Sequence, residues 1–181
     1  NYSVIPDRIE AGTYAVAALI TNGKITLNKI NREMMSNIFQ ILKKAGAKIV
    51  FGKNNSVTIS RKIIKPTTIK TMPYPGFPTD MQAQLMSLLC LSKGSSLIKE
   101  EIFENRFLHV SELKRMGANI KITNQSANIT GIVNLNGAEV MATDLRASVS
   151  LVLAGLAAKG TTIINRIYHL ERGYENLVSK L

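Results

Sequence analysis

The sequence predicts an α/β protein made of three copies of one unit, in which a helix, a strand, a second helix and a pair of strands follow one another. Three turn glycines, Gly23, Gly94 and Gly160, each follow an apolar helical run, and they are spaced 71 and 66 residues apart. A second glycine, Gly46 or Gly117, comes 23 residues later in two of the units and is typical of a helix end. We therefore expect one fold unit to be used three times.

The first unit opens with a carboxylate and an arginine, Asp7-Arg8, and continues into the apolar run 15–20, which predicts a helix. β-Branched residues then predict a strand at 24–27. In the next segment an apolar residue recurs every three or four positions, which predicts an amphipathic helix. Its apolar stripe consists of Met34, Ile38, Ile41, Leu42 and Ala45, and two strands are expected after it, at 48–51 and 57–59.

The second unit repeats this order after a proline-rich connector at 72–78. The connector is rigid and extended, so Thr79 is expected as the N-cap of the next helix, with Asp80 in its first turn. Asp80 is interpreted either as a functional carboxylate or as an ordinary helix-start carboxylate that the macrodipole favours. The apolar run 85–89 continues this helix, and the elements expected after it are a strand at 96–98, a helix at 110–116 and strands at 119–122 and 128–130.

The third unit opens at Asp144 and Arg146, runs apolar through 149–156 and predicts a strand at 161–164. Its second helix begins an apolar stripe but is unfinished, because the matching glycine is expected near position 183. We expect a fragment of a longer polypeptide, forming a single domain. The stripe is Tyr174, Leu177, Val178 and Leu181, and the expected repeats are 1–77, 78–142 and a truncated 143–181.

Arginines stand in the first turn of two of these helices, at Arg8 and Arg146. The helix macrodipole prefers anions there, so each arginine opposes a local rule. When a rule is broken twice at equivalent places, a functional reason is indicated. The sequence therefore favours a bound anion near the helix starts.

The composition describes a folded globular protein, with 45% hydrophobic and 19% charged residues in 181, and no apolar run is long enough to span a membrane. The net charge of +11 would suit a nucleic-acid-binding domain. However, the lysines are scattered and no tryptophan is present for stacking. Solvated surface charge and a positive cleft for phosphorylated small molecules explain the charge better. The single cysteine, Cys90, excludes internal disulfides and is expected in the core.

Several ordered motifs resemble those of the UDP-N-acetylglucosamine enolpyruvyl transferases, and the resemblance spans essentially the whole chain. The motifs are Val4-Ile5-Pro6-Asp7-Arg8-Ile9-Glu10, Phe77-Pro78-Thr79-Asp80-Met81-Gln82-Ala83-Gln84, Phe103-Glu104-Asn105-Arg106-Phe107, Glu112-Leu113-Lys114-Arg115-Met116-Gly117-Ala118, Ala142-Thr143-Asp144-Leu145-Arg146-Ala147-Ser148 and Arg166-Ile167-Tyr168-His169-Leu170-Glu171-Arg172-Gly173-Tyr174-Glu175.

The resemblance implies an inside-out α/β barrel, in which three βαβαββ units pack their helices inside and their sheets outside. It implies that the chain is the second, C-terminal domain of a two-domain bacterial cytoplasmic enzyme of peptidoglycan synthesis. The N-terminal domain, with a mobile loop cysteine and a lysine that contact phosphoenolpyruvate, would be its partner. Such an enzyme needs no cofactor or metal, and the expected partners include no nucleic acid and no membrane. The fragment alone is expected to be inactive.

The resemblance also implies roles for individual residues. Asp80 would contact the sugar hydroxyl and handle its proton, and the backbone of Ile102 would bind the nucleotide sugar. Three arginines would reach toward the reacting anion, and their planar forks suit carboxylate and phosphate. These are Arg106, Arg146 and Arg172.

Other candidate binding residues have structural alternatives. Asp144 and Glu104 are either substrate contacts or local ion-pair partners of the arginines two positions after them. Arg8 is either a ligand or a hinge residue. The two histidines, His109 and His169, are expected to be satisfied structural residues, since no metal-ligand spacing surrounds them.

Two alternative functions remain open at this point. A shikimate-pathway enolpyruvyl transferase would share the fold and the type of reaction, although the motifs around Asp80 and Arg172 speak against it. A basic nucleic-acid-binding module is the alternative from another class.

Overall fold

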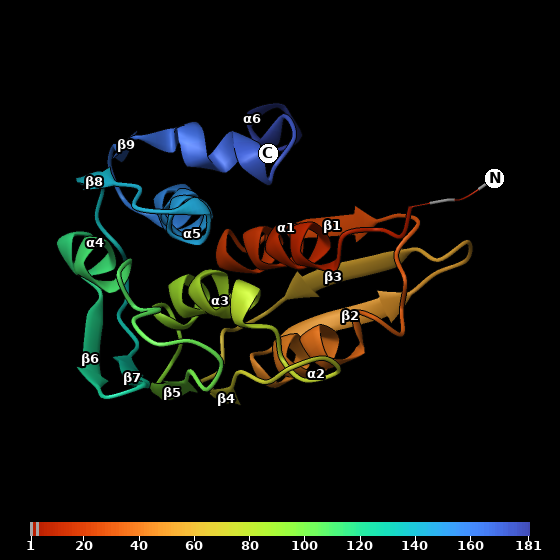
Figure 1. Ribbon diagram of the computed structural model, residues 1–181, viewed down its shortest axis with the longest axis horizontal. Helices are drawn as coiled ribbons and strands as arrows, with labels where there is room; N and C mark the ends of the chain where they lie inside the picture. The colour runs from red at the N-terminus through yellow and green to blue at the C-terminus, as the bar shows by residue number, and fades with distance from the viewer. Residues whose placement is uncertain (1, 3) are drawn as a thin grey trace.

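The computed structural model describes residue 2 and residues 4–181. Three helices lie side by side at its centre (Figure 1). Every residue of the second and most residues of the other two are buried, as expected for helices that are apolar on all faces. They are α1 (Arg8–Ile20), α3 (Gln82–Leu89) and α5 (Leu145–Ala157).

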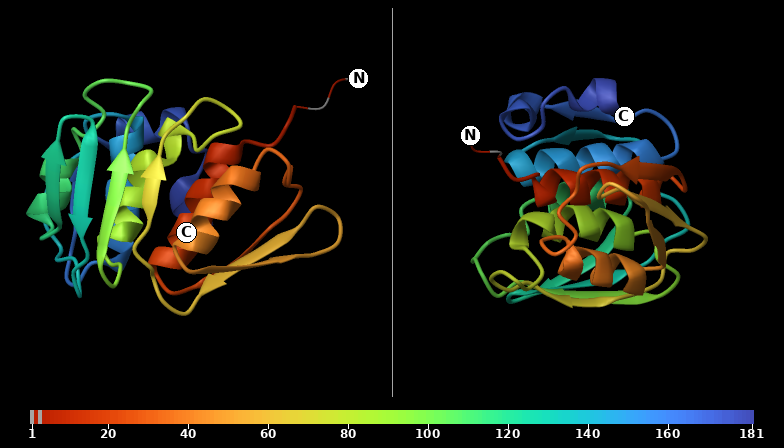
Figure 2. Two further views of the ribbon diagram at one scale, coloured as in Figure 1. Left: turned by 90° about the horizontal axis from the view of Figure 1, so that it is seen from below. Right: turned by 90° about the vertical axis from the view of Figure 1, so that its right-hand side faces the viewer.

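Three sheets lie outside these helices (Figure 2). The first is antiparallel with order β1-β3-β2, the second has order β4-β5-β7-β6, and the third is a parallel pair, β8-β9. The strands are β1 (Lys24–Leu27), β2 (Ala47–Phe51), β3 (Val57–Arg61), β4 (Thr68–Lys70), β5 (Ser95–Lys99), β6 (Asn119–Thr123), β7 (Ser126–Thr130), β8 (Glu139–Met141) and β9 (Ile163–Asn165).

Shorter helices complete the units. They are α2 (Ser36–Lys44), α4 (Val110–Arg115), the 3₁₀ helices η1 (Thr79–Met81) and η2 (Ile167–Arg172), and α6 (Leu177–Lys180). The predicted α/β class and the inside-out arrangement of the three repeats are confirmed, because the central helices are enclosed by the sheets. Among the described residues, no helix combines the length and the apolar character required to span a membrane.

The pairing of two strands differs from the predicted grouping. β4 pairs in parallel with β5, and β8 pairs in parallel with β9, so each forms a strand–helix–strand crossover with a central helix. The expected boundaries at 77/78 and 142/143 assign β4 to the first unit and β8 to the second. Their hydrogen bonds instead join each of them to the unit that follows. In the second and third repeats, therefore, a strand precedes the central helix.

The apolar stripe predicted for the last helix is only half buried. Tyr174 and Leu177 belong to a small core cluster with Tyr14, whereas Val178 is 86% exposed and Leu181 is 50% exposed. The reason is that this cluster covers one side of α6 only. The prediction of one continuous stripe is thus wrong for its last two members.

Candidate active site

The N-terminal ends of the three central helices meet at one hollow of about 160 Å³. Helix starts carry partial positive charge and unpaired N–H groups, so their convergence favours anionic groups. The hollow is lined by Asp7, Ile9, Glu10, Asp80, Leu145, Arg146, Gly173 and Tyr174.

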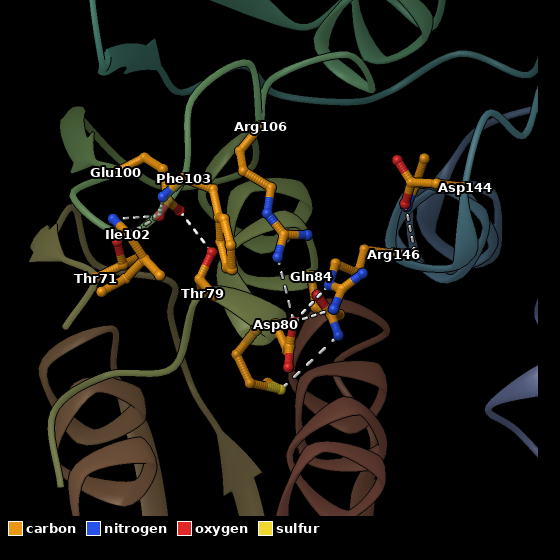
Figure 3. Close-up of polar contacts among 12 residues, drawn as sticks. Thr71, Thr79, Asp80, Gln84, Glu100, Ile102, Phe103, Arg106, Asp144 and Arg146 are labelled. Atoms are coloured by element: carbon orange, nitrogen blue, oxygen red, sulfur yellow. Dashed lines mark hydrogen bonds and ion pairs between the residues drawn. The ribbon is translucent and has the colours of Figure 1, made fainter. Parts of the chain in front are cut away.

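Asp80 lies between two arginines that come from other parts of the chain (Figure 3). It stands in η1, which leads directly into α3. Arg146, from the first turn of α5, donates from Nε to Asp80 Oδ1 at 2.5 Å and pairs with the same oxygen through Nη2. Arg106, from the loop after β5, brings its Nη2 to 3.6 Å from that oxygen. Two guanidinium groups against one carboxylate leave the cluster with an excess positive charge.

Both arginine contacts reach the same oxygen of Asp80. Within the described residues, the other oxygen, Oδ2, has no hydrogen-bond or ion-pair partner. The Asp80 side chain is 40% exposed. The arginines therefore fix the carboxylate and leave its second oxygen open to a ligand. We call Asp80, Arg106 and Arg146 the charged triad.

Asp144 is a helix cap and does not pair with Arg146. Its Oδ1 accepts hydrogen bonds from the backbone N–H groups of Arg146 at 2.7 Å and Ala147 at 3.0 Å. Of the two alternatives for Asp144, the local ion pair is wrong, because the Arg146 guanidinium is directed to Asp80 instead. Capping fixes the first turn of α5 and so the direction in which Arg146 leaves it.

Arg8 does not join the charged triad. Its guanidinium lies over the Tyr74 ring, 4.9 Å from the centroid, beside a different hollow between the start of α1 and residues 30–35. Asp7 caps α1 by accepting from the N–H of Ile9 at 2.7 Å, as Asp144 does for α5. The arginines at the two helix starts therefore have different partners: a carboxylate for Arg146 and an aromatic ring for Arg8.

Two more predicted residues lie at the edge of the site. Arg172 is exposed at the end of η2, although the next two residues line the hollow. Glu104 is exposed and forms no ion pair within the described part of the chain; Arg106 instead stacks on Phe103, 4.6 Å from the ring centroid. Of the two alternatives for Glu104, the ion pair with Arg106 is wrong, because that guanidinium lies between Phe103 and Asp80.

The sequence profile of EPSP synthase (3-phosphoshikimate 1-carboxyvinyltransferase) matches residues 1–181. The chain belongs to the EPSP synthase family.

Curated relatives whose names give UDP-N-acetylglucosamine as the acceptor are more than half identical to this chain. The UDP-N-acetylglucosamine 1-carboxyvinyltransferase of Pelagibacter ubique (strain HTCC1062) is 58% identical over 181 residues, which are 100% of this chain and 43% of that protein. The corresponding protein of Orientia tsutsugamushi (strain Ikeda) is 57% identical with the same coverage. The chain thus spans less than half the length of the curated relatives it matches.

Two solved structures confirm the fold. The enolpyruvyl transferase NikO from Streptomyces tendae superimposes with a TM-score of 0.88 at 30% identity, covering 99% of this chain and 43% of that one. An EPSP synthase from Acinetobacter baumannii gives a TM-score of 0.68 at 20% identity, covering 90% of this chain and 39% of that one. The latter likeness shows the fold alone.

Two polar residues next to the charged triad, Thr79 and Glu100, form a contact that the sequence did not predict. Thr79 was expected as a helix N-cap, but the N-cap position of η1 is occupied by Pro78. The hydroxyl of Thr79 instead donates to Glu100 Oε2 at 2.9 Å. Glu100 is 1% exposed and also accepts from the N–H of Ile102 at 3.0 Å. A carboxylate at the end of a strand, followed by a turn, was the only signal in the sequence, and it does not identify a partner 21 residues earlier.

A second hollow of about 260 Å³ lies beside Arg106. It is more apolar than the first, because two phenylalanines, a leucine and an isoleucine line it. Arg106 lines this second hollow but not the first, and its partners there are Glu100, Phe103, Asn105, Phe107, Leu108, Ile122, Asn124 and Gln125.

His109 is buried, and one of its ring nitrogens is without a hydrogen-bond partner within the described residues. It is 3% exposed, and its Nε2 has no hydrogen-bond partner within the described residues. Burial lowers the pKa of His109 to about 4; Asp144 opposes this shift and Arg106 adds to it. The prediction that His109 is a satisfied structural histidine is therefore wrong at Nε2. His169 is half-buried, with its ring 4.1 Å from that of Tyr168.

The free energy of unfolding of the chain is expected to fall as the pH decreases from about 6.5 toward 4, partly because of His109. Between these values the unfolded chain binds a proton at this imidazole that the folded chain does not, so acid favours unfolding. The contribution is at most roughly 3 kcal/mol. Urea unfolding across this range should show a shallower pH slope for His109→Gln than for wild type or His169→Gln. Equal slopes in all three proteins would refute this assignment.

Cys90 is confirmed as a core residue. It is fully buried in the central layer, and burial raises the pKa of its thiol to about 12. A thiol in this environment is inert. In residue 2 and residues 4–181, no group of three or more potential ligand side chains is placed to hold a metal ion.

Proposed function

We propose that this chain is the part of a UDP-N-acetylglucosamine 1-carboxyvinyltransferase that carries the charged triad. The whole protein would transfer the enolpyruvyl group of phosphoenolpyruvate to the 3′-hydroxyl of UDP-N-acetylglucosamine and release phosphate. The observation that carries the proposal is Asp80 held by Arg106 and Arg146, with one oxygen left open. Relatives of that name at 53 to 58% identity support the choice of acceptor.

The reaction has two steps, and both move protons and negative charge. The sugar hydroxyl loses its proton and its oxygen bonds to C2 of phosphoenolpyruvate, while C3 gains a proton and becomes a methyl group. The tetrahedral intermediate then loses a proton from C3 and its phosphate leaves, which restores the double bond. A base near the hydroxyl and cations near the carboxylate and phosphate are therefore required.

In this proposal Asp80 accepts the hydroxyl proton at its open Oδ2. Arg146 and Arg106 keep that oxygen directed into the hollow and add positive charge where the anionic co-substrate arrives. Arg172 is assigned to the same anion, at the edge of the hollow. Asp144 acts through Arg146 as the cap of α5, and Arg8 and Glu104 are kept as outer binding residues.

The backbone of Ile102 is proposed to bind the nucleotide sugar. Its N–H already donates to Glu100, so its carbonyl oxygen is the backbone group available to a sugar hydroxyl or amide. The other domain would supply the cysteine loop and lysine, and the enzyme would act in the bacterial cytoplasm at the first committed step of peptidoglycan synthesis, without a cofactor.

A phosphate-release assay with two acceptors tests the proposed function. The full-length protein is expected to release phosphate from phosphoenolpyruvate with UDP-N-acetylglucosamine and not with shikimate 3-phosphate. The 181-residue chain alone is expected to show no turnover, since the proposed partner residues are absent from it. Turnover with shikimate 3-phosphate alone would contradict the acceptor, and turnover by the isolated chain would contradict the need for a second domain.

A further inference from the structure

Glu100 is a carboxylate that the structure buries without a cation. It is 1% exposed, at the end of β5, and no ion pair reaches it within the described residues. A buried carboxylate is costly unless its oxygens are fully hydrogen-bonded. A side chain kept in this position therefore needs either a structural or a functional reason.

Four donors satisfy this carboxylate, and they divide between its two oxygens (Figure 3). Oε1 accepts from the hydroxyl of Thr71 at 2.8 Å and from the N–H groups of Ile102 at 3.0 Å and Phe103 at 3.3 Å. Oε2 accepts from the hydroxyl of Thr79 at 2.9 Å. One oxygen thus holds the loop after β5, and the other holds the residue next to Asp80.

The contacts close a ring that passes through two members of the charged triad, Asp80 and Arg106. From Glu100 one path runs through the N–H of Phe103 to its ring, over which the guanidinium of Arg106 lies, and on to Asp80. The other path runs through Thr79, the chain neighbour of Asp80. A local turn around Glu100 would require only the first path, so the second indicates a link between two separate segments.

We infer that Glu100 is a positioning residue that fixes the Ile102–Phe103 backbone relative to Asp80. Resting on the proposed function, this means that one buried carboxylate aligns the acceptor-binding backbone with the group that removes the acceptor's proton. Such alignment matters because displacement of reacting groups by about 1 Å costs on the order of a hundredfold in rate.

Because Thr71 and Thr79 donate to different oxygens of Glu100, their substitutions are expected to have different effects. Thr79→Val removes the hydroxyl at nearly constant volume and frees the Asp80 turn, so kcat is expected to fall roughly tenfold with the KM for UDP-N-acetylglucosamine within about twofold. Thr71→Val loosens the other side, where Thr71 also accepts from the N–H of Glu101 at 2.9 Å, and is expected mainly to raise that KM. Thr79→Ser keeps the hydroxyl and should restore kcat.

The test uses the full-length protein and combines steady-state kinetics with amide hydrogen exchange. In Glu100→Ala the N–H groups of Ile102 and Phe103 lose their acceptor, so their exchange is expected to speed up at least about tenfold, with a smaller effect in Glu100→Gln. Glu101→Gln is the matched control, because within the described residues the side chain of this exposed neighbour forms ion pairs with Lys70 and Lys99 and does not contact the loop or Asp80.

Each outcome decides the inference. Faster exchange in Glu100→Ala together with the kcat loss of Thr79→Val and its rescue by serine supports it. Unchanged exchange at the two amides, or equal kcat for Thr79→Val and wild type, overturns it. If wild type does not use UDP-N-acetylglucosamine, the proposed function fails, while the exchange data still decide whether Glu100 holds this backbone.

Discussion

Asp80→Asn in the full-length protein is expected to lower kcat for phosphate release by roughly 10³-fold or more, with a smaller change in KM. An amide keeps the shape of the side chain but cannot take up the hydroxyl proton, and general base catalysis contributes about 10²- to 10⁴-fold. The substitution also removes the negative charge that both arginines contact, so Arg146 and Arg106 lose their common partner. Steady-state phosphate release at saturating substrates measures the effect.

A nearby carboxylate provides the control for this prediction. Glu101→Gln removes an acidic group that pairs with Lys70 at 2.6 Å and Lys99 at 2.7 Å on the surface of the second sheet. Exposed pairs of this kind contribute little, so activity should stay within about twofold of wild type. Equal losses in the two variants, or an active Asp80→Asn enzyme, would mean that Asp80 is only a helix-start carboxylate.

Leu85→Ala is expected to produce the largest loss of stability among simple substitutions. Leu85 is completely buried in α3, the helix whose every residue is buried between the other central helices and the sheets. The substitution leaves a cavity that close-packed neighbours cannot fill, and it should reduce the free energy of unfolding by about 2 to 5 kcal/mol. Urea unfolding monitored by circular dichroism measures the change.

Two further leucine variants separate cavity formation from a general effect of alanine. Leu85→Met conserves volume and should cost less than about 1.5 kcal/mol. Leu156→Ala, at a position 46% exposed in α5, should change stability by about 1 kcal/mol or less. Equal losses at Leu85 and Leu156 would contradict a core built on the central helices.

The fold was largely predictable because its signals are local and repeated. Apolar runs marked the central helices, glycines marked helix ends, and β-branched runs marked most strands. The parallel pairs β4–β5 and β8–β9 were not predictable, since their partners are separated by a whole helix and the first strand of each pair has only three residues. Pairing across such a distance depends on tertiary packing, which a short sequence window does not contain.

The site was predictable in part, for a similar reason. The motifs pointed to Asp80, Arg106 and Arg146, and the structure brings these three together. It does not bring Arg8 or Glu104 to Asp80. The Arg8 guanidinium lies over a tyrosine ring, and Glu104 is exposed. Adjacency in sequence suggested local ion pairs, whereas the observed pairs join residues 26 and 66 positions apart.

A double-mutant cycle between Asp80 and Arg146 tests the central claim most directly. The cycle compares kcat/KM for phosphate release with UDP-N-acetylglucosamine in Asp80→Ala, Arg146→Ala, the double variant and wild-type full-length protein. If the two side chains act as one unit, the double variant should be about as impaired as the worse single variant, because each substitution already disables the unit. Losses that multiply in the double variant would show two independent groups, and activity near wild type in either single variant would contradict the proposed site.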